Sequence, residues 1–101
     1  MNIETEAAMD KTIIMYSTTW CGDCRRSKRW LNENNVPFKD VNIEENEEGL
    51  HYVVQINNGS QTVPTIVFPD GAILVEPSNT QLAVQVEKSL GISTPDSQKA
   101  H

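Results

Sequence analysis

A turn sequence between two apolar runs is the strongest constraint that this chain places on its fold. Residues 69–71 read Pro-Asp-Gly, and they are flanked by TIVF before the turn and AILVE after it. Proline, aspartate and glycine favour tight turns, and a turn between two apolar runs predicts a β-hairpin. We therefore expect Thr65–Phe68 and Ala72–Glu76 to pair as antiparallel strands.

The first half of the chain predicts a strand–helix–strand unit. Residues 12–16 (TIIMY) and 38–43 (FKDVNI) have the composition of strands, and Cys24 to about Asn34 has the spacing of a helix. A crossover of this kind makes the two strands parallel. Together with the hairpin, it predicts one mixed four-stranded sheet.

Two more helices complete the predicted order β-α-β-α-β-β-α. One is expected between residues 44 and 59, where four acidic residues precede an apolar face. The other is expected to begin at Ser78 or Asn79, with Leu82, Val86 and Leu90 on its inner face. This order is typical of an α/β fold. We expect one domain over residues 11–91, a flexible N-terminal segment at 1–10 and a flexible C-terminal tail at 92–101.

Composition excludes several classes of function. The chain has 101 residues, is 38% hydrophobic and has a formal net charge of −6. Its size suits one small domain, and its acidity argues against nucleic-acid binding. No run of 18 apolar residues exists, and the N-terminus lacks a basic start followed by an apolar stretch. We therefore expect a cytoplasmic monomer that acts on neither membranes nor nucleic acids.

The chain has two cysteines, Cys21 and Cys24, and they lie where the predicted first strand gives way to a helix. In a cytoplasmic protein, a close cysteine pair is more often redox-active or metal-binding than structural. The free N–H groups at a helix start favour negative charge, and a thiol attacks as the thiolate. We expect Cys21 to be the nucleophile and Cys24, one turn further on, to be the resolving thiol.

Basic and aromatic residues surround this pair. Arg25, Arg26, Lys28 and Arg29 follow it directly, although cations near a helix N-terminus oppose the helix dipole. Two interpretations stay open: Arg25, Arg26 or Arg29 touches a substrate, or the cations form a solvated helix face. Trp20, next to the first thiol, is expected to line the active-site surface, and Trp30 is expected to pack in or beside the core.

The motif W-C-x-x-C at a helix start, joined to T-V-P at residues 62–64 before a hairpin, resembles the glutaredoxin branch of the thioredoxin superfamily. The resemblance covers residues 11–91 and implies a thioredoxin-like fold with no cofactor. It implies that Cys21 attacks mixed disulfides and that Cys24 resolves them. It also implies that Val63 offers its backbone to the thiol ligand and that Pro64 follows a cis peptide bond.

Departures from the family pattern point to a subgroup. Gly22-Asp23 stands where glutaredoxins usually carry Pro-Tyr, and Thr18 stands where they usually carry a lysine. EPSNTQL replaces the Gly-Gly-acidic segment that holds the γ-glutamyl end of glutathione. The sequence is closer to mycoredoxin-like proteins, which act on other thiols such as mycothiol. Ser78 and Asn79 are expected to offer neutral hydrogen bonds to such a substrate.

The resemblance implies a thiol–disulfide oxidoreductase that reduces mixed disulfides between proteins and a low-molecular-weight thiol. A mycothiol-like or bacillithiol-like thiol is favoured over glutathione, and a disulfide reductase system is expected to recycle the protein. Alternatives are a dithiol electron donor to ribonucleotide reductase, a metal or iron–sulfur-binding module, and a non-catalytic adaptor. A structural zinc site needs four ligands, and beyond the cysteines the chain offers only the distant His51 and His101. The presence of both cysteines argues against an adaptor.

Overall fold

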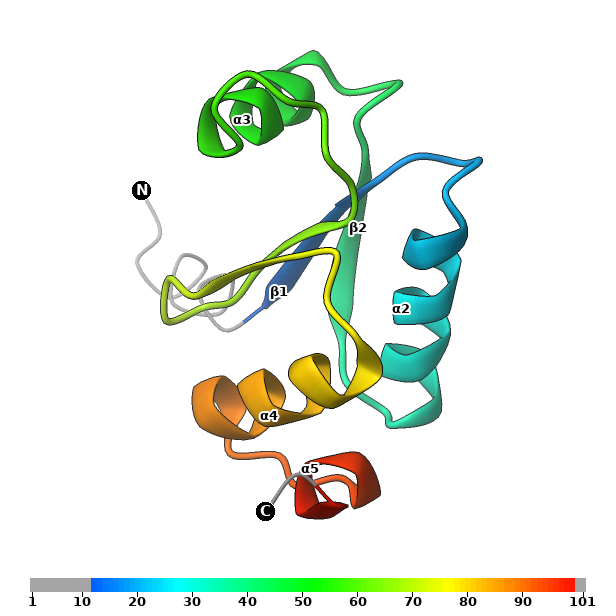
Figure 1. Ribbon diagram of the computed structural model, residues 1–101, viewed down its shortest axis with the longest axis vertical. Coiled ribbons are helices and arrows are strands. Elements are labelled where there is room, and N and C mark those ends of the chain that lie inside the picture. Colours follow the sequence, from blue (N-terminus) through cyan, green and yellow to red (C-terminus); the bar gives the residue numbers. More distant parts are fainter. Residues whose placement is uncertain (1–11, 100–101) are drawn as a thin grey trace, which may run out of the picture.

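The computed structural model of the protein describes residues 12–99, so the expected flexible segment at residues 1–10 lies outside the described residues. The described elements follow the predicted order, with one addition at the C-terminal end. In chain order they are β1 (Ile13–Ser17), α2 (Gly22–Glu33), β2 (Phe38–Asn42), α3 (Glu47–Ile56), β3 (Thr65–Val67), β4 (Ile73–Val75), α4 (Asn79–Leu90) and α5 (Pro95–Lys99). Figure 1 shows the sheet between α3 on one side and α2 and α4 on the other.

The sheet has four strands in the order β2-β1-β3-β4. β1 and β2 are parallel, with Ile13 opposite Phe38 and Ser17 opposite Asn42. β3 is antiparallel to both β1 and β4, and Ile66 lies opposite Leu74 in the hairpin. The prediction of a mixed sheet with a parallel crossover and a C-terminal hairpin is confirmed. The parallel register places the C-terminal ends of β1 and β2 at the same edge of the molecule.

The hydrophobic core lies between one face of the sheet and helices α2 and α4. Alternate residues of β1 point into it, as expected for a strand with a period of two. The buried cluster consists of Ile13, Met15, Trp30, Leu31, Val36, Ile66, Phe68, Leu82, Ala83 and Val86. The sequence-based expectation that Trp30 packs in the core is confirmed, since only 4% of this residue is exposed.

The opposite face of the sheet is covered by α3. Asn46 caps this helix by accepting a hydrogen bond from the Gly49 N–H at 2.7 Å. A Cβ atom on Gly49 would lie 2.9 Å from Val41 Cγ1, so glycine allows the helix to approach the sheet closely. The rings of Tyr16 and Tyr52 pack 5.1 Å apart in the same layer. Burial raises the pKa of Tyr16, and Tyr52 adds to this rise.

Residues 92–101, expected to form a flexible tail, include a further helix. Pro95–Lys99 forms α5, and Thr94 and Ser97 at its start are buried and bond to each other. The Trp30 indole N–H donates to Asp96 Oδ2 at 2.5 Å and ties α5 to α2. Residues 95–99 are therefore helical, and the flexibility of this segment stays a prediction. Within residues 12–99, no helix is long and apolar enough to cross a membrane.

Candidate active site

Cys21 stands in the connection between β1 and α2 and is itself the N-cap residue of α2. Its backbone is extended, with φ −87° and ψ 114°, and its Sγ accepts the Cys24 N–H at 3.1 Å. The sequence had predicted a helix beginning at about Cys24, whereas α2 begins at Gly22. A helix start leaves backbone N–H groups without intrahelical partners, and Cys21 Sγ accepts one of these groups as the cap of α2.

The two sulfurs differ in their access to solvent. Only 8% of Cys21 is exposed, yet this residue lines an open cavity. Cys24 has no exposed surface and does not line that cavity. Burial, together with the side-chain hydrogen bond with Cys21, raises the pKa of the Cys24 thiol to about 12. Cys24 is therefore held as a neutral thiol at physiological pH.

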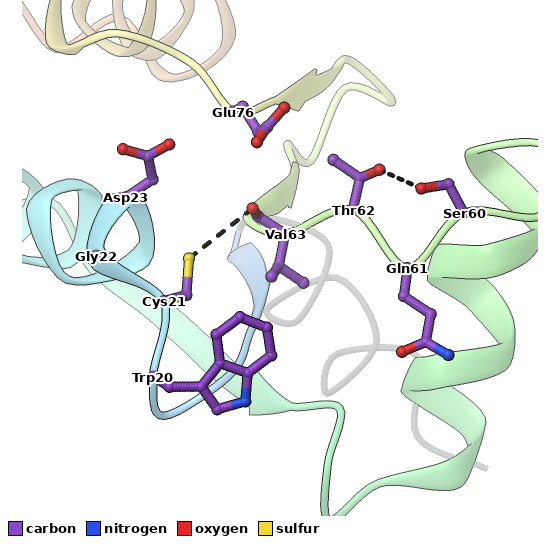
Figure 2. A pocket seen from close by; sticks show the side chains of 9 residues that line it. All are labelled: Trp20, Cys21, Gly22, Asp23, Ser60, Gln61, Thr62, Val63 and Glu76. Carbon is purple, nitrogen blue, oxygen red and sulfur yellow. Dashed lines mark hydrogen bonds between the residues drawn. The ribbon is translucent and has the colours of Figure 1, made fainter.

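The segment before β3 closes the other side of the reactive sulfur. The Cys21 thiol donates to the Val63 carbonyl oxygen, with Sγ and O 3.8 Å apart (Figure 2). The Val63–Pro64 peptide bond is cis, as the resemblance implied, and Pro64 is buried. Thr65 Oγ1 donates to the Thr62 carbonyl at 2.8 Å and fixes the turn into β3. The structure thus brings together three predicted site residues, Cys21, Cys24 and Val63.

The cavity beside Cys21 has a volume of about 590 Å³ and is formed by three separate segments. Its lining residues are Trp20, Cys21, Gly22, Asp23, Ser60, Gln61, Thr62, Val63 and Glu76. Figure 2 shows Asp23 and Glu76 on one side of the reactive sulfur and the Trp20 ring on the other. Among residues 12–99, the lining contains two carboxylates and no lysine, arginine or histidine. The surroundings of Cys21 are therefore acidic, although four cations follow it in the sequence.

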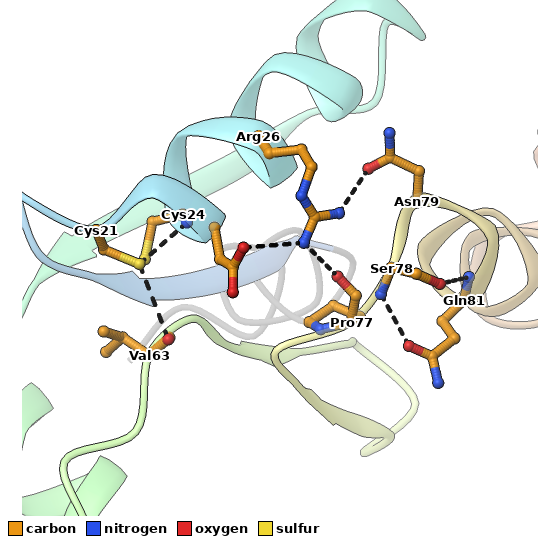
Figure 3. Close-up of polar contacts among 9 residues, drawn as sticks. Cys21, Cys24, Arg26, Val63, Pro77, Ser78, Asn79 and Gln81 are labelled. Atoms are coloured by element: carbon orange, nitrogen blue, oxygen red, sulfur yellow. Dashed lines mark hydrogen bonds and ion pairs between the residues drawn. The ribbon is translucent and has the colours of Figure 1, made fainter.

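None of those four cations lines the cavity, although Arg26 pairs with Asp23 of the lining. Arg25 donates to the Thr19 carbonyl at 3.1 Å, and Lys28 pairs with Asp40 at 2.7 Å. Arg26 donates to the Pro77 carbonyl and to Asn79 Oδ1, both at 3.2 Å, and lies 3.4 Å from Asp23 Oδ1 (Figure 3). Arg29 is exposed and does not line the cavity. Of the two interpretations of the basic residues, the arrangement favours structural and solvated roles.

Ser78 and Asn79 also serve the fold rather than line the cavity. Ser78 is the N-cap of α4 and forms a capping box in which its Oγ accepts the Gln81 N–H and Gln81 Oε1 accepts the Ser78 N–H. Asn79 Oδ1 is taken by Arg26. The expected cap at this position is confirmed. Substrate contact was expected for both side chains, but the structure does not bring either of them to the reactive sulfur.

Two acidic residues of the site were not predicted from the sequence. Glu44 accepts hydrogen bonds from the Trp20 indole and from Thr19, and these bonds lower the pKa of its carboxyl group. Glu76 lies in the cavity with its backbone at φ 51°, a left-handed conformation that is uncommon outside glycine, and its N–H donates to the Pro64 carbonyl. The sequence Glu-Pro-Ser, which directly follows the last strand, could have indicated that Glu76 lies at the site.

Metal binding was one of the alternatives, and the structure describes one of its two histidines. His51 is exposed on α3, and His101 lies outside the described residues. Among residues 12–99, no group of three or more histidine, cysteine, aspartate or glutamate side chains is placed to hold a metal ion.

Comparison with known proteins agrees with this geometry. The family model described as Glutaredoxin matches residues 13–73. The chain is similar to a Mycobacterium tuberculosis protein named as a glutaredoxin, with 37% identity over 79 residues that cover 78% of this chain and 94% of the relative. It is also similar to mycoredoxin 1 of Corynebacterium glutamicum, with 28% identity over 75 residues, 74% of this chain and 92% of the relative.

A solved structure supports the same fold. The crystal structure of a variant of a thioredoxin-like protein aligns with a TM-score of 0.64 at 22% identity, covering 82% of this chain and 99% of that chain. The predicted thioredoxin-like α/β fold, with a mixed four-stranded sheet and three main helices, is thereby confirmed. With the family match and the cysteine pair taken together, the chain belongs to the glutaredoxin family and is a thiol–disulfide oxidoreductase with a Cys21–Cys24 pair.

Proposed function

We propose that this protein acts in the cytoplasm and reduces mixed disulfides between proteins and a low-molecular-weight thiol other than glutathione. The favoured thiols are mycothiol-like or bacillithiol-like, and the charge of the cavity favours the mycothiol type of the two, because the malate group of bacillithiol carries carboxylates. The similarity to mycoredoxin 1 supports this subgroup, and the acidic cavity beside Cys21 is the observation that carries the proposal.

The reaction begins at the sulfur that lines the cavity. The Cys21 thiolate attacks the small-thiol sulfur of the mixed disulfide, so a new Cys21–small-thiol disulfide forms and the protein thiolate leaves. The thiolate of a second small thiol can then attack the small-thiol sulfur of this disulfide, so that a small-molecule disulfide forms and the Cys21 thiolate leaves. Alternatively, Cys24 loses its proton and attacks Cys21, releasing the small thiol and forming the Cys21–Cys24 disulfide. A disulfide reductase system returns that disulfide to two thiols.

The charge of the cavity argues against glutathione. Glutathione carries two carboxylates and one ammonium group, and among residues 12–99 the cavity lining presents the carboxylates of Asp23 and Glu76 with no lysine, arginine or histidine. Thr18, at the position where glutaredoxins usually carry a lysine, is buried and lies outside the lining. Arg26 is the nearest cation to Asp23, and it is already shared among three acceptors. The two carboxylates of glutathione would therefore meet repulsion and gain no charge-assisted contact from the described lining residues.

The expected discrimination is modest in energy but large in rate. A charge-assisted hydrogen bond is commonly worth about 1.5–3 kcal/mol. A tenfold difference in kcat/KM needs only ~1.4 kcal/mol of transition-state binding. We therefore expect at least a tenfold preference for a thiol without carboxylates over glutathione.

Side-by-side kinetics test this proposal. One client protein is capped in turn with glutathione, mycothiol or bacillithiol, and kcat/KM is measured for each. Mycothiol carries no carboxylate, so we expect the mycothiol-capped client to be reduced fastest. If the glutathione-capped client is reduced fastest, the proposed thiol class is wrong.

Variants of the cavity test whether its charge is the cause. The double variant Asp23→Asn/Glu76→Gln removes both carboxylates and is expected to narrow the gap between mycothiol and glutathione by at least about threefold. Glu33→Gln makes the same type of charge change at the far end of α2, and it is expected to leave the gap unchanged. Equal behaviour of the two variants would show that cavity charge does not set the preference.

A further inference from the structure

An exposed tryptophan forms one wall of the cavity. The Trp20 side chain belongs to a residue that is 68% exposed, while Trp30 is 4% exposed. Large exposed aromatic side chains beside a reactive group commonly mark a binding surface. Trp20 also directly precedes Cys21, so a group attached to the attacked sulfur would lie against its ring (Figure 2).

A side chain with so much exposed surface has little packing to hold it in one position. Exposed side chains change rotamer on the picosecond to nanosecond timescale, and ordering them at the moment of binding weakens affinity. A defined wall at this place therefore needs an anchor from outside the cavity. Figure 2 shows the indole nitrogen on the edge of the ring that faces away from Cys21.

Glu44 supplies that anchor from the segment that follows β2. Its Oε2 accepts the Trp20 indole N–H at 2.7 Å. Its Oε1 accepts the Thr19 N–H at 3.3 Å and the Thr19 hydroxyl at 3.1 Å. One carboxylate thus holds both the Thr19 backbone and the Trp20 ring, which precede Cys21 in the chain. Glu44 itself does not line the cavity.

We propose that Glu44 is a positioning residue that holds the Trp20 indole as a preformed wall against which the substrate binds. Glu44 touches neither the substrate nor the reacting sulfurs. It acts through the Trp20 indole, which its carboxylate keeps turned with the carbon edge toward the cavity. The role of Glu44 concerns the binding of a disulfide substrate. It rests on the proposed function only for the identity of that substrate.

The test compares four variants on one mixed-disulfide peptide that the wild type reduces. Glu44→Gln keeps the size of the side chain but removes the negative charge, and Trp20→Phe keeps an aromatic ring but removes the indole N–H. The double variant Trp20→Phe/Glu44→Gln tests whether one acts through the other. Glu45→Gln is the matched control, because Glu45 is an adjacent exposed carboxylate with no bond to Thr19 or Trp20.

For Glu44→Gln we expect KM to rise roughly threefold to tenfold with kcat within about twofold, because ordering of the wall is lost while the sulfurs are unchanged. Glu45→Gln is expected to match the wild type. In the Trp20→Phe background, Glu44→Gln is expected to have no further effect on KM. The Trp20 indole resonance in a ¹⁵N-correlated NMR spectrum should shift in Glu44→Gln and stay in place in Glu45→Gln, with assignment from Trp20→Phe.

Three outcomes would overturn the inference: equal KM values for Glu44→Gln and Glu45→Gln, an indole resonance that does not move, or a full effect of Glu44→Gln in the Trp20→Phe background. The last would mean that Glu44 acts through Thr19 instead. These results are distinct from failure of the proposed function, which would appear as a wild type that reduces only substrates of another class. In that case the same four variants are compared on whichever disulfide the wild type does reduce.

Discussion

Replacing Cys21 with serine leaves Cys24 as the only thiol, and we expect that thiol to be nearly inert while the protein is folded. Cys24 has no exposed surface, and burial is the largest of the causes that raise its pKa from 9.0 to about 12. The thiolate is the reactive form of a cysteine. Cys21→Ser is therefore expected to lose all thiol-exchange activity, because Cys24 is both protonated and out of reach.

The size of the effect follows from the pKa. A rise from 9.0 to about 12 lowers the thiolate fraction roughly a thousandfold at any pH well below 9. The Cys21→Ser variant loses the contribution of the hydrogen bond between the two cysteines but keeps the burial. We therefore expect alkylation of Cys24 to be at least about a hundredfold slower in the folded variant than in the unfolded chain.

The assay is alkylation by iodoacetamide at pH 8, followed by mass spectrometry. Cys21→Ser is treated in its folded state and again after unfolding in urea. The alkylation rate of the unfolded chain is the reference for the rate in the folded state. Cys24→Ser is the matched control, because its remaining thiol lines the cavity and is expected to react in the folded state. Folded Cys21→Ser that reacts within tenfold of its unfolded rate, or that still reduces disulfides, would refute the assignment of the two sulfurs.

Stability measurements test two other parts of the structure. Gly49→Ala would place a Cβ 2.9 Å from Val41 Cγ1. Overpacking of this kind costs about 1–3 kcal/mol, whereas alanine in place of glycine stabilises a helix by about 1 kcal/mol. We therefore expect the free energy of unfolding to fall by about 1 kcal/mol. Urea denaturation measures this free energy. Gly22→Ala is the control, because a Cβ at Gly22 meets nothing within 4 Å. Equal denaturation midpoints for the two variants would contradict the packing argument. Because the raised pKa lets the folded state keep the Cys24 proton to higher pH than the unfolded chain, the free energy of unfolding should fall as pH rises from about 9 to 12. Cys24→Ser should lose this part of the slope, and an unchanged slope would contradict the cause.

Features that depend on neighbouring residues could be predicted from the sequence. The Pro-Asp-Gly turn gave the β3–β4 hairpin, and Ser78 was one of two residues expected to cap α4. The position of Cys21 at a helix start followed from the strand before it and the helical spacing after it. In each of these cases, a few adjacent residues determine the local conformation.

Contacts between distant segments explain the features that could not be predicted. Glu44 and Trp20 meet because the parallel pairing of β1 and β2 brings the C-terminal ends of both strands to one edge of the sheet. Arg26 follows the cysteine pair directly in the sequence, yet a helix turns its side chain toward Asn79, 53 residues further along the chain. Proximity in sequence left open whether an arginine reaches the substrate, and in the fold the described lining of the cavity is acidic.

The short helix α5 was missed for a different reason. Its start carries a local signal, with Thr94 before Pro95 and an acidic residue in the first turn. A helix of five residues does not form alone, and such helices depend on tertiary contacts. Here the Trp30–Asp96 hydrogen bond spans 66 residues and supplies one. The sequence pattern around Thr94 gave no indication of that partner.

The sulfur that caps α2 is the same sulfur that the proposed reaction converts into a disulfide. A thiolate is a stronger hydrogen-bond acceptor than the neutral sulfur of a disulfide, so covalent capture of Cys21 weakens its bond to the Cys24 N–H. We therefore expect the first turn of the helix to be held more firmly while Cys21 is a thiolate than after its sulfur has been captured in a disulfide. Backbone amide exchange at Cys24 consequently records the covalent state of the site. A partner that contacts this turn meets a looser backbone once the protein has been oxidised.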